Sequence, residues 1–250
     1  MSRLLTLVYS FVCYALFNLT FLYLAGFLLE VFVPKTINSG EVVHWTRATA
    51  INLALIALFG ATHSIMARDW FKRWWTTFVP EIAERSTYVL QSSIFLALAI
   101  WQWQPMPWTV WQVEGDAAWV FYAAFGGAAV LLLWSTFLID HFELFGLRQA
   151  WCYWRGVAMP KPQFRTPALY RIVRHPMQLG ITIMFLATPH MTVGHLLFAS
   201  AMIAYIMIGL YFEERSLVRH FGDDYRTYQS RVPMLIPLLH LGRARPLSAT

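Results

Sequence analysis

Four ionisable residues in the last third of the chain are the clearest candidates for a binding site. Arg174 and His175 precede an apolar run, and Glu213 and Glu214 follow the next one. A carboxylate accepts hydrogen bonds from hydroxyl or ammonium groups, and a cation pairs with a carboxylate. The four residues together suit a ligand that carries hydroxyl or amino groups beside an acid. Adjacent helical residues point about 100° apart, so the sequence leaves open which glutamate faces the ligand.

A second set of residues could remove a proton from a reacting group. His63 lies at the end of an apolar segment, and Asp140 and His141 follow another. Histidine titrates near neutral pH and suits general-base chemistry, directly or through water. On a helix, Asp140 and Glu143 share one face, from which His141 is turned away. We therefore expect His141 to meet a neighbour such as His63 or Arg85.

The cysteines and histidines do not form a metal-binding pattern. Cys13 lies in an apolar run and Cys152 in a polar one, and neither has a second cysteine at metal spacing. The histidine segments around His63 and His141 lack third and fourth ligands at familiar spacings. We predict no metal site.

Long apolar segments must position these groups. Of the 250 residues, 58% are hydrophobic and 13% are charged, about half the charged fraction of a soluble domain. Four segments approach or exceed the ~20 residues that a helix needs to cross a bilayer. They are residues 4–33, 48–66, 87–103 and 117–139.

A polar stretch at 140–176 is followed by two further apolar runs, 177–188 and 191–212, which predict a helical hairpin. The first arm is short, so it either spans the bilayer partly or continues a helix that begins near Pro167. The sequence predicts an all-α integral membrane protein with about five to six transmembrane helices. We expect one domain over residues 1–250. Residues 1–139 would form four transmembrane helices, and residues 140–250 a binding half with the hairpin and a cytoplasmic C-terminal segment.

The basic residues predict the orientation of the chain. Lys and Arg gather between the second and third apolar segments, between the fourth and fifth, and after the hairpin, whereas residues 104–116 contain neither. The positive-inside rule then places both termini in the cytoplasm, as in a multi-pass protein of the bacterial inner membrane. The net charge of +6 thus reflects membrane topology and not nucleic-acid binding. Tryptophans around this loop without Lys or Arg predict an aromatic belt at the opposite surface: Trp101, Trp103, Trp108, Trp111 and Trp119.

Residues 171–237 carry a pattern with many fixed spacings. They read RIVRHPMQLG, then the apolar hairpin, then YFEERSLVRHFGDDYRTYQSRVPMLIP. This resembles the isoprenylcysteine carboxyl methyltransferase and phospholipid methyltransferase superfamily, whose C-terminal half carries RHPxYxG, a hairpin and EExxLxxxFGxxYxxYxxxVPxxIP. The chain has Gln178 where the family has the tyrosine after RHPx, so any role of that hydroxyl is missing here.

The resemblance implies a membrane methyltransferase with S-adenosylmethionine as methyl donor. This donor presents a sulfonium, an amino-acid head and a ribose diol. A glutamate would bind the ribose hydroxyls or the ammonium, and a cation would bind the carboxylate. Phe221 and Gly222 predict a helix stop, after which Tyr225 could close over the cofactor. The residues expected at the cofactor are Arg174, His175, Gln178, Glu213, Glu214 and Tyr225.

Two N-terminal segments carry a narrower resemblance. FGATHSIMARDWFK at 59–72 and LIDHFELFGLRQAW at 138–151 are similar to segments of NnrU-like membrane proteins and, more closely, of bacterial membrane thiol methyltransferases. This implies a small apolar thiol as acceptor, with methanethiol favoured and dimethyl sulfide as product. A simple alkyl thiol is mostly protonated at neutral pH, so a base or cation is needed near the sulfur. The candidate catalytic residues are His63, Asp140 and His141.

Other functions fit parts of the same pattern. The superfamily machinery could methylate a lipid amine or a prenylcysteine carboxylate. An NADPH-dependent enzyme like the sterol reductases would share the C-terminal half, although this chain lacks the longer upstream run of helices expected there. A transporter or membrane scaffold is a non-enzymatic alternative. Its polar residues would lie toward the middle of the membrane, whereas here they gather at one interface.

Overall fold

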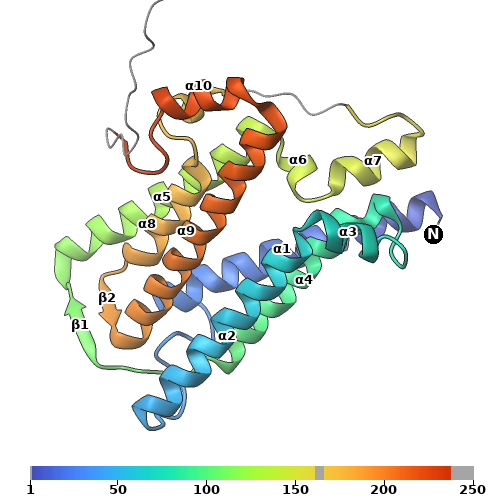
Figure 1. The fold of residues 1–250 in the computed structure, drawn as a ribbon. Coiled ribbons are helices and arrows are strands. Elements are labelled where there is room, and N and C mark those ends of the chain that lie inside the picture. The colour runs from blue at the N-terminus through green and yellow to red at the C-terminus, as the bar shows by residue number, and fades with distance from the viewer. Residues whose placement is uncertain (1, 161–165, 238–250) are drawn as a thin grey trace, which may run out of the picture.

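The protein is a bundle of antiparallel helices, described here by a computed structural model for residues 2–160 and 166–237 (Figure 1). The principal helices are α1 (Arg3–Leu29), α2 (Trp45–Met66), α4 (Glu81–Gln102), α5 (Ala118–Ile139), α8 (Pro176–Leu186) and α9 (Val193–Phe221). Shorter helices are α3 (Asp69–Trp75), α6 (His141–Leu144), α7 (Leu147–Arg155) and α10 (Asp223–Arg231). Single 3₁₀ turns are η1 (Gly115–Ala117) and η2 (Ala168–Arg171), and two strands, β1 (Thr109–Gln112) and β2 (His190–Thr192), pair with each other.

Four helical segments are long and apolar enough to cross a membrane: α1, α2, η1 with α5, and α9. The predicted all-α membrane fold is therefore confirmed. Helix α4 has 22 residues but begins with charged side chains. Helix α8 has 11 residues, which at 1.5 Å per residue cover about 16 Å, roughly half of the hydrocarbon core. The predicted total of five to six crossings stays a prediction.

The helix boundaries follow local sequence signals. Helix α8 starts at Pro176, separate from η2, so it does not continue a helix from Pro167. Proline suits this position because the first helical residue needs no N–H donor. Helix α9 ends at Phe221, and Gly222 has a φ of +59°, as the predicted helix stop requires. Glycine reaches this conformation without strain, so the chain can turn sharply into α10.

The helices pack in two neighbouring groups joined along α2 and α9. Helix α4 contacts both α1 and α2, α5 lies along α8, and α9 contacts α8 and α2 (Figure 1). Large apolar side chains fill the joint core, including Phe27, Phe185 and Phe198. Trp103 also belongs to this core and is only 1% exposed. Its predicted place in an aromatic belt was wrong, because its ring packs against Phe198 at 5.4 Å.

The strands were not expected from the sequence. β1 lies in the loop without Lys or Arg and β2 in the break between the hairpin arms, and they pair antiparallel with Gln112 opposite His190. The indole N–H of Trp111 also donates to the carbonyl of Thr188 at 3.1 Å. The pairing ties the α4–α5 connection to the α8–α9 turn at the end of the bundle away from the charged segments.

The charged segments share the opposite end. Figure 1 shows the N-terminus, α3, α6, α7 and α10 gathered there, with the strands at the other end. The last turns of α2, α5 and α9 and the start of α8 all reach this side. The candidate polar residues of the sequence therefore lie at a common end of the bundle.

The close packing of α8 against α5 depends on Gly180. A Cβ added there would lie 2.8 Å from the carbonyl oxygen of Ala128 and 3.0 Å from the nitrogen of Leu132, both on α5. Such small residues let membrane helices pack closely. We expect Gly180→Ala to destabilise the protein by about 1–3 kcal/mol, as overpacking does. Thermal unfolding in detergent measures the effect.

Gly209 provides the matched control on α9, because an added Cβ there meets nothing within 4 Å. Gly209→Ala should keep or slightly raise the melting temperature. Equal losses in the two variants would contradict the role assigned to the α5–α8 contact.

Candidate active site

The carboxylate of Glu214 on α9 is the centre of an ionic cluster. Arg174 donates from Nε to Oε1 at 2.6 Å and from Nη2 to Oε2 at 2.9 Å. Nε2 of His175 lies 3.1 Å from Oε1. The side chains of Arg174, His175 and Glu214 are only 10%, 4% and 14% exposed. The cluster is thus a charge-assisted, bidentate arrangement largely shielded from water.

Helix α10 supplies further donors to the same carboxylate. The hydroxyl of Tyr225 donates to Oε1 at 3.3 Å, and Nε2 of Gln229 donates to Oε2 at 2.9 Å. Tyr225 and Gln229 are four residues apart and so share one face of α10. Nη1 of Arg174 donates to the carbonyl oxygens of Gln229 and Val232. Glu214 therefore joins α8, α9 and α10.

Backbone contacts fasten the same segments together. The N–H of Arg174 donates to the carbonyl of Pro233 at 2.9 Å, and that of His175 to Met234 at 3.1 Å. The two halves of the sequence motif, RHP and VPMLIP, are hence in direct contact. The spacings in this motif are explained by the need to bring these segments to Glu214.

The tyrosines of α10 remain hydrogen-bond donors at neutral pH. Burial, followed by the nearby Glu214 carboxylate, raises the pKa of Tyr225 above its usual value. Burial likewise raises the pKa of Tyr228 to about 12, although the Arg174 charge acts in the opposite direction. Tyr228 donates its hydroxyl to the carbonyl of Tyr170 and thereby holds η2 against α10.

Glu213 differs from its neighbour in being exposed. No hydrogen bond or ion pair to it occurs among the described residues. It nevertheless lies within electrostatic reach of Tyr88 on α4, Tyr170 on η2, His175 at the start of α8 and Tyr225 on α10. Because Glu214 is committed to the cluster, Glu213 is the carboxylate available to a ligand.

His63 lies on α2 between polar groups of α4. Its Nδ1 is 2.9 Å from Oγ of Ser92, and its Nε2 is 2.7 Å from the hydroxyl of Tyr88. The ring of Tyr205 on α9 meets the His63 ring edge to face, with centroids 6.3 Å apart. The hydroxyl of Tyr205 pairs with Ser64 at 3.2 Å. His63 thus lies where α2, α4 and α9 meet.

Asp140 and His141 serve a different part of the fold. Asp140 caps α6 by accepting from the N–H of Glu143 at 2.9 Å, and it forms an ion pair with Arg148. His141 is 4% exposed, and burial lowers its pKa. These contacts favour a structural role, and catalysis by Asp140 or His141 stays a prediction.

The expected partners of His141 were wrong. Its Nδ1 lies 2.7 Å from Oγ1 of Thr136 and its Nε2 lies 2.6 Å from the hydroxyl of Tyr14, so neither nitrogen meets His63 or Arg85. The turn at Asp140 redirects the chain after α5, and this points the imidazole toward α1.

Gln178 is half-buried in the first turn of α8. Direct contact of this residue and of the Glu214 cluster with a cofactor stays a prediction. Within residues 2–160 and 166–237, no group of three His, Cys, Asp or Glu side chains is placed to hold a metal ion.

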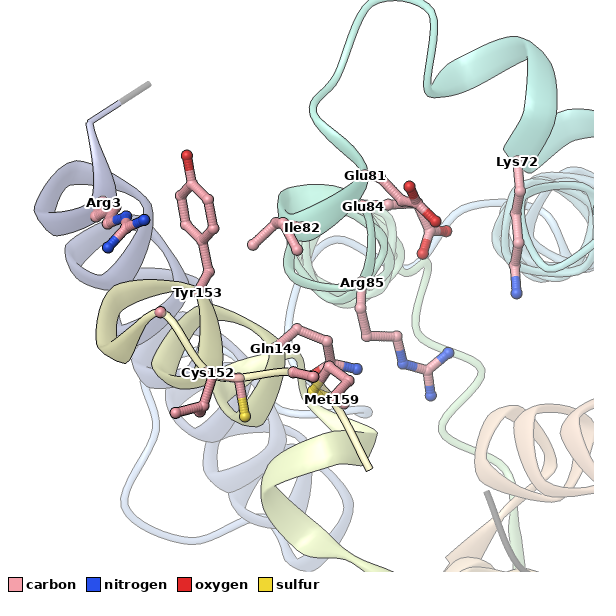
Figure 2. Close-up of a pocket in the computed structure, with 13 residues that line it drawn as sticks. Arg3, Lys72, Glu81, Ile82, Glu84, Arg85, Gln149, Cys152, Tyr153 and Met159 are labelled. Atoms are coloured by element: carbon pink, nitrogen blue, oxygen red, sulfur yellow. The ribbon is translucent and has the colours of Figure 1, made fainter. Parts of the chain in front are cut away.

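A cavity of about 740 Å³ opens at the charged end of the bundle. Figure 2 shows it between α4, α7 and the first turn of α1. Its charged and amide lining residues are Arg3, Lys72, Glu81, Glu84, Arg85 and Gln149. The guanidinium carbon of Arg85 also lies 5.1 Å from the ring centre of Tyr88. Arg85 therefore lines this cavity and also contacts Tyr88, the partner of His63.

Comparison with known proteins shows where this arrangement belongs. Methanethiol S-methyltransferase 2 of Bradyrhizobium diazoefficiens is 50% identical, over 97% of this chain and 93% of the relative. Methanethiol S-methyltransferase of Mycobacterium tuberculosis is 46% identical over 96% of this chain and 99% of the relative. Methanethiol S-methyltransferase of Pseudomonas sp. strain GM41(2012) is 48% identical over 94% of this chain and 91% of the relative. The chain belongs to the methanethiol S-methyltransferase family.

The methanethiol S-methyltransferase family fits the wider resemblance of the motif. The family model for phospholipid methyltransferases matches residues 122–224, which include α8, α9 and the Glu214 carboxylate. No solved structure matches the chain. The superfamily predicted from the motif is confirmed.

Several residues of the site were not predicted from the sequence. Tyr88 and Ser92 lie four apart within the apolar segment of α4, and this spacing of polar groups is a signal for a shared helix face. Gln229 follows Tyr225 at the same interval. Tyr14 gave no signal, because a single tyrosine in an apolar helix is unremarkable.

The Glu214 cluster makes a direct prediction for stability. Glu214→Gln keeps the side-chain shape but leaves the Arg174 charge without its counter-ion. Breaking a buried pair in this way costs about 3–5 kcal/mol. We expect a clearly lower melting temperature and earlier proteolysis of the C-terminal segment.

Glu213→Gln is the matched control for stability, since Glu213 is exposed and bonded to no described side chain. It should change the unfolding free energy by less than about 0.5 kcal/mol. A Glu214→Gln protein as stable as this control would refute the central role of the cluster.

Proposed function

We propose that this protein methylates methanethiol with S-adenosylmethionine as donor and releases dimethyl sulfide. The observation that carries the proposal is the 46–50% identity over nearly the whole chain to proteins named for this reaction. Methylation of a lipid amine or prenylcysteine carboxylate has no comparable support, and neither does an NADPH-dependent reduction.

Glu213 is the residue best suited to hold the donor. S-adenosylmethionine supplies a methyl group on a positively charged sulfur, together with ribose hydroxyls and an ammonium group. An exposed carboxylate can accept hydrogen bonds from these hydroxyls or from the ammonium. Glu214 positions the surrounding elements, because Arg174, His175 and Tyr225 already bond to it.

We place the reaction at the cytoplasmic surface of the bacterial inner membrane, with both termini in the cytoplasm. The basic segments and the Glu213 region lie at one end of the bundle, which the positive-inside rule assigns to the cytoplasm. A polar donor would then enter from water. A small apolar thiol would partition into the adjacent bilayer and reach the same site.

The proposed reaction is tested with the purified full-length protein in detergent. Methanethiol and S-adenosylmethionine are supplied together, and the headspace is analysed by gas chromatography. We expect dimethyl sulfide in amounts that rise with enzyme and time. The donor should raise the melting temperature while NADPH should not. Dimethyl sulfide no higher than in a boiled sample would refute the proposed acceptor.

The assignment of Glu213 is tested by binding. Glu213→Gln should weaken S-adenosylmethionine binding roughly tenfold or more in calorimetry, because it removes a charged acceptor. The fold should remain intact, as judged by thermal unfolding. Unchanged affinity in this variant would remove Glu213 from the donor site without affecting the proposed reaction.

A further inference from the structure

The hydrogen bonds around His63 determine which nitrogen carries its proton. Oγ of Ser92 donates to the backbone carbonyl of Tyr88 at 2.8 Å. With its hydrogen committed there, Ser92 can only accept from Nδ1 of His63. Nδ1 therefore bears the proton, and Nε2 presents a lone pair to the hydroxyl of Tyr88 at 2.7 Å. His63 is arranged as a neutral base whose accepting nitrogen is covered by Tyr88.

The hydroxyl oxygen of Tyr88 keeps its lone pairs for another donor while its hydrogen points at His63. The charged and titratable groups that act on Tyr88 come from α4 and α9: Arg85, Glu84, Tyr205 and Glu213. Arg85 packs its guanidinium over the Tyr88 ring. Tyr88 thus bonds to the base through its hydroxyl and lies within electrostatic reach of the carboxylate assigned to the donor.

The surroundings of Tyr88 suit a small apolar molecule. Tyr88 belongs to a buried cluster with Met66, Val89 and Phe145. Arg85 is one of the residues that line the cavity in Figure 2, and its guanidinium contacts the Tyr88 ring. Water and small solutes in the cavity thus come within one side chain of the cluster.

We propose that Tyr88 and His63 form a proton relay that activates the acceptor thiol, with Tyr88 in contact with the sulfur and Arg85 stabilising the thiolate. This inference rests on the thiol methylation proposed above. A free alkyl thiol is mostly protonated at neutral pH, and only its thiolate is an effective nucleophile. A base acting through one hydroxyl removes that obstacle.

The relay is balanced in protons and electrons. The thiol proton passes to the hydroxyl oxygen of Tyr88 as the tyrosine's own proton passes to Nε2 of His63. The electron pair of the broken S–H bond stays on sulfur and forms the new C–S bond. The donor's methyl–sulfur bond breaks, and its electron pair neutralises the sulfonium. His63 later releases the proton to water by way of Tyr88 and the cavity at Arg85.

A second histidine has a similar arrangement but a different setting. Oγ1 of Thr136 donates to the carbonyl of Leu133 at 2.6 Å, so it accepts from Nδ1 of His141, and Nε2 then accepts from Tyr14. The His63 ring contacts Tyr205 of α9, the helix that carries Glu213, whereas the ring contacts of His141 are with residues of α1, α5 and the α6 region. The relay is accordingly assigned to His63, and Tyr14→Phe serves as the comparison.

The test compares two acceptors of nearly equal size with different acidity. Methaneselenol is largely ionised at neutral pH and needs no base, whereas methanethiol does. Tyr88→Phe should lower kcat/KM for methanethiol by about 100-fold or more. The loss in kcat/KM for methaneselenol should be smaller than this by a factor of about ten or more. The variant's rate with methanethiol should also rise more steeply with pH than that of the wild type, because it depends on free thiolate.

Tyr9→Phe is the control for loss of a tyrosine hydroxyl next to this site. The Tyr9 hydroxyl bonds to Thr87, the neighbour of Tyr88, at 2.9 Å, and its loss should affect both acceptors equally and little. Thermal unfolding verifies that each variant is folded.

Equal losses for the two acceptors in Tyr88→Phe, or no loss at all, would overturn the relay while leaving the methylation in place. An acceptor-selective loss in Tyr14→Phe instead would overturn the assignment to His63. A wild-type protein that forms neither dimethyl sulfide nor dimethyl selenide would remove the proposed function itself.

Discussion

The shared carboxylate of Glu214 is the interaction on which the charged end of the molecule depends. Helix α8 is too short to hold its own start in place, and α10 has only nine residues. Both are fixed because Arg174, His175, Tyr225 and Gln229 all bond to one side chain of α9. A carboxylate buried without such donors would be strongly unfavourable. The free-energy cost of burying the Glu214 carboxylate is therefore offset only when α8, α9 and α10 meet and all of its donors are in place.

This commitment of Glu214 gives its neighbour a separate role. Two adjacent carboxylates on one helix would repel each other if both faced the same space. The 100° rotation between them directs Glu214 into the cluster and leaves Glu213 exposed near Tyr88 and Tyr170. One pair of glutamates thus supplies both a structural anchor and a free acceptor. Arg174 and His175, which were predicted to contact the cofactor, bond to Glu214 in this division, and their contact with a cofactor stays a prediction.

Much of the fold was predictable because hydrophobic length is a local property of the sequence. The four apolar segments predicted before residue 140 all correspond to helices, namely α1, α2, α4 and α5, although α4 is not among the helices long and apolar enough to span a membrane. The hairpin and the helix stop at Gly222 also lie where the sequence predicted them. Tertiary contacts were not predictable in this way. The burial of Trp103 and the partners of His141 depend on which side chain arrives from a distant helix. The motif around Glu214 was recognisable as a pattern, but its meaning as one cluster required the contact between residues far apart in sequence.

The two ends of the bundle are held differently, and this difference bears on the reaction. At the end with the strands, Oε1 of Glu30 accepts from both His190 and Asn38 at 2.8 Å, and Asn38 accepts from Thr192. These bonds join the end of α1 directly to β2. At the charged end, Ser64 and Tyr205 form the one α2–α9 side-chain hydrogen bond among the described residues, and the rings of Phe59 and His63 pack against Tyr205. Glu213 lies within electrostatic reach of Tyr88 without a hydrogen bond to it. The hydrogen bonds at the strand end link α1 to β2, whereas at the charged end Tyr88 of α4 and Tyr205 of α9 meet at the His63 ring.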